Sequence, residues 1–283
     1  MKKFLKIVGI IFLLISIVII YSRYIGTSGL ITKEYKLETN KINSSFDGLK
    51  IVHFSDLHYK RIVDKKFLER IVKEINLINP DIVFFTGDLI DKDFAIDNQD
   101  KDDLIECLGN IHSKYGKYTV NGNHDYVKDE NLLKEIYTNS NFKMLNNTYD
   151  IIYGNENDKL FIGGVDTYSY NKADIDKVMG YFTNNEDISY KIILVHEPDY
   201  IDNFVDKYDI DLVLSGHSHN GQINIPYLKE LFLPYGSKKY YENYYNINGT
   251  LLYVSSGIGE SRINFRLFNR PSINFYRINK ITD

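Results

Sequence analysis

From Leu49 onward, short apolar runs alternate with amphipathic segments, and this alternation predicts strands that are joined by helices. Five runs are short and rich in β-branched or aromatic residues, as buried strands are: LKIVHFS, DIVFFT, KYTV, KIILV and DLVLS. The segment DKKFLERIVKEINLINP repeats its apolar residues at helical spacing and ends at Pro80, so it predicts an amphipathic helix. A second amphipathic segment surrounds Cys107, which we expect to be a buried core thiol. Together these segments predict an α/β fold.

Residues 1–28 follow a different pattern. An uncharged, mostly apolar run extends from Ile7 to Tyr21, behind Lys2, Lys3 and Lys6. The length of this run lies between the core of a cleaved signal peptide and a full membrane span, but no small-residue cleavage pattern follows it, so we favour an uncleaved signal anchor. Lysines before the run place the N-terminus inside. We therefore expect a single-pass protein of the cell membrane whose catalytic domain is extracytoplasmic.

The remainder of the chain predicts one domain behind a short linker. Residues 29–47 are polar and predict a connector with one edge strand, and residues 48–283 predict the catalytic domain. Lys and Arg total 34 against 38 Asp and Glu, a net charge of −4. Because the sequence has no basic stripe of the kind that a polynucleotide backbone requires, we expect no nucleic-acid partner.

Polar side chains follow each of the five predicted strands. The motifs are DLH (Asp56, His58), GDLID (Asp88, Asp91), NGNHD (Asn123, His124, Asp125), HEPD (His196) and GHSH (His217, His219). In an extended segment residues i and i+2 point the same way, so the two histidines of GHSH should face one point. Ligands of α/β sheets bind beyond the carboxyl ends of the strands, so the five loops are expected to converge on one site.

A single one of these motifs would be weak evidence, because a turn can carry an incidental histidine. However, five of the seven histidines follow predicted strand ends: His58, His124, His196, His217 and His219. The other two, His53 inside a strand and His112 on a helix, are interpreted as structural. The set is too large for one tetrahedral zinc and suits two ions, with Mn, Fe or Zn favoured by the mixed imidazole, carboxylate and amide donors. Two such ions lower the pKa of a shared water and clamp the oxygens of a displacement at phosphorus, so phosphoester hydrolysis is expected.

In this order the motifs resemble those of the calcineurin-like metallophosphoesterase superfamily, which run DxH, GDxxD, GNH(D/E), H and GHxH. The resemblance implies a four-layer α/β/β/α sandwich of two mixed β-sheets flanked by helices. It also implies a ligand for each metal position: Asp56, His58 and His219 for the first ion, Asn123, His196 and His217 for the second, and Asp88 as the bridge between them. His124 would assist the leaving oxygen and Asp91 would orient His124. Asp125 has either a supporting role or a salt bridge elsewhere.

Within that superfamily, the N-terminal anchor, HEPD, GHSHNGQ and VSSGIGESRINFRLFNRPSI resemble a bacterial membrane-associated branch. Asn220 stands where that branch usually has a second glycine, and Asn tolerates the left-handed backbone that such a turn needs. We expect a membrane-anchored phosphohydrolase that cleaves a phosphodiester or pyrophosphate bond by attack of a metal-bridging hydroxide, with a lipid-linked pyrophosphate as one candidate substrate. The alternatives are a phosphomonoesterase or phosphoprotein phosphatase, and a catalytically silent metal-binding scaffold at the membrane.

The last sixty residues carry no predicted metal ligand. YLKELFLPYGSKKYYENYYNING predicts a surface loop or lid, with a substrate-contacting or membrane-facing surface as the alternative. Arg262, Arg266 and Arg270 are interpreted as surface ion pairs, with phosphate binding as the alternative. The alternation in INFRLFNRPSINFYRI predicts terminal strands of a second sheet packed on the first.

Overall fold

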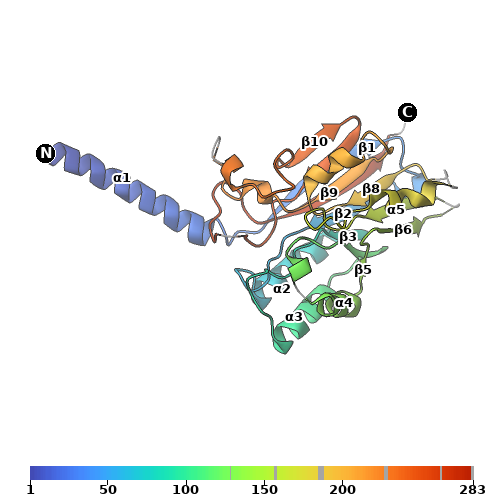
Figure 1. The fold of residues 1–283 in the computed structure, drawn as a ribbon, viewed down its shortest axis with the longest axis horizontal. Coiled ribbons are helices and arrows are strands. Elements are labelled where there is room, and N and C mark those ends of the chain that lie inside the picture. The colour runs from blue at the N-terminus through green and yellow to red at the C-terminus, as the bar shows by residue number, and fades with distance from the viewer. Residues whose placement is uncertain (128, 156–157, 184–187, 226–228, 262, 282–283) are drawn as a thin grey trace.

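A computed structural model describes residues 1–127, 129–155, 158–183, 188–225, 229–261 and 263–281. Within these residues the chain forms two six-stranded mixed sheets that pack face to face, with helices on both outer faces (Figure 1). The predicted α/β/β/α sandwich, with an apolar helix at the N-terminus, is therefore confirmed.

The first sheet has the strand order β1-β12-β2-β3-β4-β5. Its strands are β1 (Ile31–Thr39), β12 (Ser272–Lys280), β2 (Leu49–Phe54), β3 (Ile82–Phe85), β4 (Gly116–Thr119) and β5 (Phe142–Met144). The second sheet has the order β10-β11-β9-β8-β7-β6. Its strands are β10 (Tyr244–Ile247), β11 (Thr250–Val254), β9 (Leu212–Ser215), β8 (Lys191–Leu194), β7 (Lys159–Gly164) and β6 (Thr148–Tyr153). In both sheets the central strands are parallel, which brings their carboxyl ends to one edge.

Helices cover the outer face of each sheet. The first sheet is covered by α2 (Lys65–Ile78), α3 (Asn98–Gly109) and α4 (Glu130–Asn139), and the second by α5 (Ile175–Met179) and the 3₁₀ helix η5 (Pro198–Asn203). Asp64 caps the N-terminus of α2, since its carboxylate accepts the backbone N–H of Phe67 at 2.8 Å. The helix ends at Asn79, which adopts a left-handed conformation with φ of 52°.

Three apolar layers hold the sandwich together. Ile51 and Phe84 of the first sheet pack with Leu194 and Leu214 of the second in the middle layer. Phe54 and Phe85 point to the opposite face of their strands, into the layer beneath α2 and α3. Cys107 is buried in that same layer, as expected. Strands that are buried on both faces carry apolar residues at consecutive positions, which explains runs such as IVFF in β3.

The N-terminal helix stands apart from this core. It comprises α1 (Lys2–Ile20) and the π-helical turn η1 (Tyr21–Ile25), and none of the α1 residues is buried. Figure 1 shows α1 projecting away from the domain. The stretch Lys2–Ile25 is long and apolar enough to cross a membrane.

Three details of the sequence interpretation were wrong. The last strand, β12, lies between β1 and β2 of the first sheet and is not part of the second. Arg266 is completely buried and makes no surface ion pair, while Arg262 lies outside the described residues. His112 follows α3 and is exposed. The alternation of apolar residues had indicated a terminal strand correctly, but alternation sets the two faces of a strand and does not select its sheet.

Candidate metal centre

The predicted site residues all lie in loops that leave the carboxyl ends of parallel strands. Asp56 and His58 follow β2, Asp88 and Asp91 follow β3, and Asn123 and His124 follow β4 of the first sheet. From the second sheet, His196 follows β8, whereas His217 and His219 follow β9. The two sheets thus deliver their loops to one edge of the sandwich, as the strand pattern predicted.

The backbone of these loops is bent in an unusual way. Five of the site residues have positive φ although none is glycine: Asp56, His58, Asp88, His217 and His219. Such conformations are uncommon for non-glycine residues and are concentrated at functional sites. Gly122 is required where the β3 and β4 loops meet, because a Cβ on it would clash with the Asp88 carboxylate. The local strain therefore serves to aim side chains inward.

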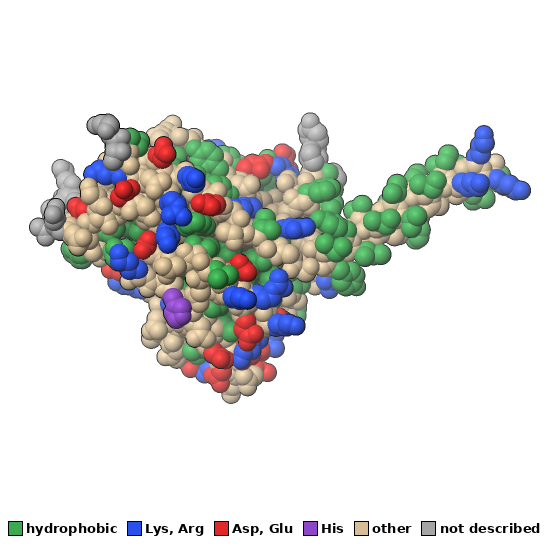
Figure 2. Space-filling model, turned by 180° about the vertical axis from the view of Figure 1, so that it is seen from behind, with side chains coloured by type: hydrophobic (Ala, Val, Ile, Leu, Met, Phe, Trp, Pro, Cys, Tyr) green, Lys and Arg blue, Asp and Glu red, His purple; other side chains and the backbone are tan. Residues whose placement is uncertain are grey.

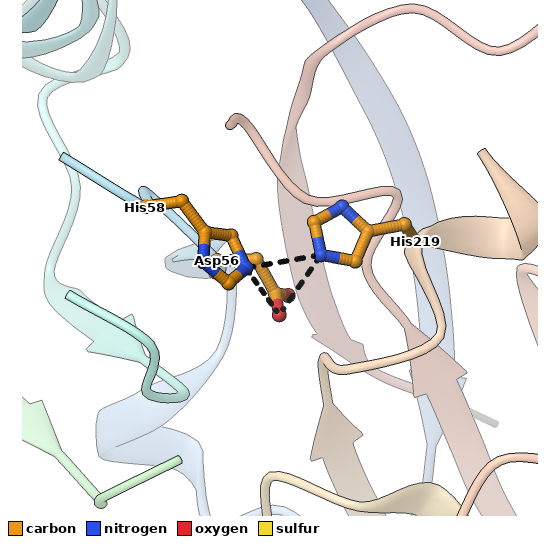
Figure 3. A group of neighbouring side chains, drawn as sticks. All are labelled: Asp56, His58 and His219. Atoms are coloured by element: carbon orange, nitrogen blue, oxygen red, sulfur yellow. Dashed lines mark hydrogen bonds and ion pairs between the residues drawn. The ribbon is translucent and has the colours of Figure 1, made fainter. Parts of the chain in front are cut away.

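Asp56, His58 and His219 form the first group that could hold a cation (Figure 3). The Nε2 atoms of the two histidines are 3.2 Å apart. Oδ1 of Asp56 lies 3.9 Å from Nε2 of His58 and 3.5 Å from Nε2 of His219. All three side chains are buried, and their donor atoms point to a common centre.

Asp88, His196 and His217 form a second such group. Oδ2 of Asp88 is 3.3 Å from Nε2 of His196 and 3.6 Å from Nε2 of His58, which belongs to the first group. Asp88 therefore stands between the two groups. Asn123 lines the same cavity as Asp88, and its Oδ1 is buried without a hydrogen-bond partner.

Backbone carbonyls orient two of these histidines. Nδ1 of His196 donates to the carbonyl of Thr86 at 2.6 Å, so Nε2 is the nitrogen that faces the Asp88 carboxylate, 3.3 Å away. Nε2 of His217 donates to the carbonyl of Tyr235 at 2.7 Å, which leaves the lone pair on Nδ1. Imidazole nitrogens and an unpartnered amide oxygen, buried beside carboxylates, fit transition-metal ions such as Mn, Fe or Zn.

The charges of the site also favour bound cations. Burial alone would raise the pKa of Asp88, but the imidazoles of His196 and His124 outweigh it and hold this pKa well below its ordinary value. Burial would lower the pKa of His196, and the Asp88 carboxylate instead raises it well above its ordinary value. Protons on the imidazoles thus compensate buried carboxylates, and metal ions would replace these protons.

His124 and Asp91 lie beside these two groups. Nδ1 of His124 accepts the backbone N–H of Lys92 at 3.2 Å, and burial lowers the pKa of His124 to about 4. The ring is therefore neutral with its proton on Nε2. The Asp91 carboxylate accepts two bonds from Arg61, at 2.7 and 3.2 Å. It lies 3.4 Å from Nδ1 of His58 and 4.0 Å from Nδ1 of His124, so it is closer to His58.

For Asp125 the sequence left two alternatives, a supporting role in the site or a salt bridge elsewhere. Asp125 accepts the backbone N–H groups of Gly122, Asp88 and Leu89, at 2.9, 2.8 and 3.0 Å, and so ties the β3 loop to the β4 loop. Burial and the Asp88 carboxylate raise the pKa of Asp125 to about 7. The position of Asp125 directly after the GNH motif is the sequence feature that indicated a supporting role.

Glu197 and Arg266 support the site from further away. The buried Glu197 carboxylate accepts bonds from the hydroxyl of Thr167 and from backbone N–H groups of the same loop. Nη2 of Arg266 lies 3.3 Å from Nδ1 of His219, and its guanidinium also donates to the carbonyls of Ser256 and Gly257. No local pattern in the sequence distinguishes Arg266 from its neighbouring arginines.

A cavity of about 190 Å³ opens above the metal-binding groups. One wall carries Asp88, Asn123, His124, His217 and His219. The lining also includes the apolar residues Ile223, Pro234 and Ile263. The cavity therefore combines polar and apolar side chains, which is the usual composition of a site for a small organic ligand.

Comparison with known proteins gives a consistent picture. The calcineurin-like phosphoesterase family matches residues 49–221. The uncharacterized metallophosphoesterase YkuE of Bacillus subtilis is 31% identical over 91% of this chain and 88% of the relative. A transmembrane protein with a metallophosphoesterase domain from Danio rerio is 29% identical over 85% of this chain, which spans 55% of that relative.

Among solved structures, the sulfate thiohydrolase SoxB of Thermus thermophilus superimposes with a TM-score of 0.51. The match covers 82% of this chain and 57% of SoxB at 11% sequence identity. At that identity the likeness concerns the fold alone.

Proposed function

Because the chain belongs to the calcineurin-like phosphoesterase family, we propose that it hydrolyses a phosphodiester or pyrophosphate bond at the membrane surface, using two divalent metal ions. Members of this family are metal-dependent phosphoesterases, and the chain contains the side-chain groups that such chemistry needs. The choice of bond and the membrane location are our inferences.

The position of Asp88 carries the proposal. Its carboxylate lies within 3.6 Å of imidazole nitrogens from both ligand groups, and its backbone is fixed by Asp125. A carboxylate between two groups is the arrangement that a bridging ligand requires. We therefore assign the ligand sets as follows: Asp56, His58 and His219 for one ion, Asn123, His196 and His217 for the other, and Asp88 for both.

The ions, when bound, would lower the pKa of a water molecule and neutralise charge on the phosphoryl group. The protein holds the imidazoles in place, since the carbonyls of Thr86 and Tyr235 fix two of the rings. We assign His124 to stabilise the leaving oxygen through a hydrogen bond from its Nε2–H, because Nδ1 already accepts the N–H of Lys92. Asp91, held by Arg61, positions the His58 ring and lies near His124.

Two features support the substrate class. The helix Lys2–Ile25 would confine the site to a membrane surface, and Lys2, Lys3 and Lys6 before it favour a domain outside the cytoplasm. Ile263 and Pro234 line the same cavity as the proposed metal ligands, which suits an ester with an organic group on both sides of the phosphorus. A phosphodiester or pyrophosphate of the cell envelope meets both conditions, and a lipid-linked one is a candidate.

The test compares two substrates with the same leaving group. The full chain in detergent micelles is loaded with Mn²⁺, its metal content is measured, and hydrolysis of bis-p-nitrophenyl phosphate is compared with that of p-nitrophenyl phosphate. We expect faster cleavage of the diester and loss of cleavage in His217→Ala. His112→Ala is the matched control, because His112 is exposed and outside the site. Faster cleavage of the monoester would reject the diester proposal, and absence of bound metal would reject the two-metal centre.

A further inference from the structure

A second cavity lies where the N-terminal helix meets the domain. It measures about 470 Å³ and is formed by two separate parts of the chain. Arg23, Tyr24, Thr27 and Ser28 come from the end of the helix, and Arg61, Lys66, Phe67 and Arg70 come from the loop after β2 and from α2. The cavity is distinct from the metal centre, with which it shares no lining residue.

The lining of this cavity is strongly cationic. Four lining residues are cations: Arg23, Arg61, Lys66 and Arg70. The single carboxylate in the lining belongs to Asp64, whose Oδ1 accepts the backbone N–H of Phe67 at the start of α2. Arg61 is committed to Asp91 and Asp93. Within the described parts of the chain, no ion pair joins the other three cations to a carboxylate. Figure 2 shows Lys and Arg side chains gathered on the domain surface near the base of the helix.

Further features make this charge suitable for an oxyanion. The first turn of α2 contains Lys66 and no acidic residue, and the capping carboxylate of Asp64 is occupied by the N–H of Phe67. The guanidinium carbon of Arg70 lies 5.4 Å from the ring centroid of Phe67. The guanidinium carbon of Arg23 lies 5.3 Å from the ring centroid of Tyr24. These contacts restrain the two guanidinium groups, whose planar forks match a phosphate.

The depth of the cavity identifies the source of the oxyanion. Arg23 and Tyr24 belong to the last turn of the stretch Lys2–Ile25, and Arg and Tyr at the end of a span lie at the level of the lipid headgroups. We propose that this cavity binds the phosphate of an anionic phospholipid headgroup. The proposal rests on α1 spanning a membrane and is independent of the phosphohydrolase activity. The same side chains would also bind a free phosphate ion, so the experiment must distinguish a lipid headgroup from free phosphate.

The experiment measures lipid binding to the full chain in detergent micelles by native mass spectrometry, with phosphatidylglycerol and phosphatidylcholine as the two probes. The test variant is Lys66→Gln with Arg70→Gln. The control variant, Lys36→Gln with Lys73→Gln, removes two exposed cations outside the cavity, one of them on α2. At about 1 kcal/mol for each basic residue near an anionic lipid, the test variant should bind phosphatidylglycerol about 30-fold more weakly, equivalent to about 2 kcal/mol.

The expected result is a preference of the unmodified chain and the control variant for phosphatidylglycerol, lost in the test variant. Hydrolysis of bis-p-nitrophenyl phosphate in micelles should be the same in all three proteins, so failure here is distinguishable from failure of the proposed activity. Equal weakening in both variants, or equal binding of both lipids by the unmodified chain, would overturn the proposal. Calorimetric titration with inorganic phosphate tests the other source. If the unmodified chain binds phosphate, the test variant does not, and neither protein prefers phosphatidylglycerol, the ligand is a free phosphate ion and the headgroup proposal is rejected.

Discussion

Replacing Glu197 with Gln tests how the buried carboxylate beside the metal centre stabilises the fold. Oε1 accepts the hydroxyl of Thr167 and the N–H of Ser169, and Oε2 accepts the N–H of Tyr168 at 3.0 Å. Burial would raise the pKa of Glu197, but the imidazoles of His196 and His217 and these hydrogen bonds outweigh it and lower this pKa below its ordinary value. The charged form is therefore the one that the fold prefers.

The magnitude follows from the geometry of the amide. Gln has one carbonyl oxygen, which can keep the bonds to Thr167 and Ser169, but its NH₂ group then faces the N–H of Tyr168. Losing a hydrogen bond to a charged group costs about 1.5–3 kcal/mol, and an unsatisfied buried N–H costs about 1–3 kcal/mol. Because these terms overlap, we expect the free energy of unfolding to fall by about 2–4 kcal/mol. In a chain of this size that loss lowers the melting temperature by about 5–15 °C.

The assay is thermal unfolding of the full chain in micelles with EDTA, so that metal affinity does not contribute. Glu74→Gln is the control, since Glu74 is exposed on α2 and should change the melting temperature by less than about 2 °C. The depressed pKa means that Glu197 contributes its full stability above the unfolded value of 4.5 and loses it as the pH falls through the lower folded value. The difference between the two proteins should therefore be present at pH 7 and shrink in acid. Equal melting temperatures at pH 7 would refute the stabilising role.

Three further predictions concern the site and the core. His124→Ala should keep its metal, measured by elemental analysis, while turnover of the diester falls by about 10²–10⁴-fold as expected for loss of a general acid; loss of metal would instead make His124 a ligand. Asp88→Asn should lose bound metal, and retention of both ions would contradict the bridging assignment. Burial lowers the pKa of Lys117 from 10.5 to about 8, so between these values the unfolded chain binds the extra proton and the free energy of unfolding rises with pH. Relative to Lys117→Met, the unmodified chain should gain about 3 kcal/mol between pH 8 and 10.5 in denaturant titrations, and parallel pH curves would show that this lysine is not desolvated.

Local sequence features allowed most of the site to be predicted. Each motif directly follows a strand, and a parallel strand delivers whatever follows it to the carboxyl edge of its sheet. The nine predicted site residues consequently lie around one centre, with Asp88 between the two ligand groups. The chemical nature of the side chains indicated cations, because clustered carboxylates and imidazoles are costly to bury without them.

The parts that could not be predicted depend on contacts between distant residues. The strand β12 pairs in parallel with β1 and antiparallel with β2, some 240 and 220 residues away. Its Ile273 packs under the helices, whereas Ile278 packs between the sheets, so its alternation suits either sheet equally. The bond from Arg61 to Asp91 links two loops whose approach is set only when β2 and β3 pair. Motifs encode which side chains enter the site, and pairing of strands decides what surrounds them.

Similar long-range contacts join the candidate metal centre to the end of the apolar N-terminal helix. The backbone N–H of Arg266 donates to the carbonyl of Ser22 in η1, at 3.0 Å, while its guanidinium lies 3.3 Å from the His219 ring. Arg61 makes a second connection, because it lines the cavity at the helix base and also holds Asp91 near His58. One candidate ligand group is therefore flanked by two arginines, of which Arg266 bonds to the end of the N-terminal helix and Arg61 lines the cavity at its base. A displacement of the helix relative to the domain would have to break the bond from Arg266 to Ser22, so the end of the helix is part of the framework of the site.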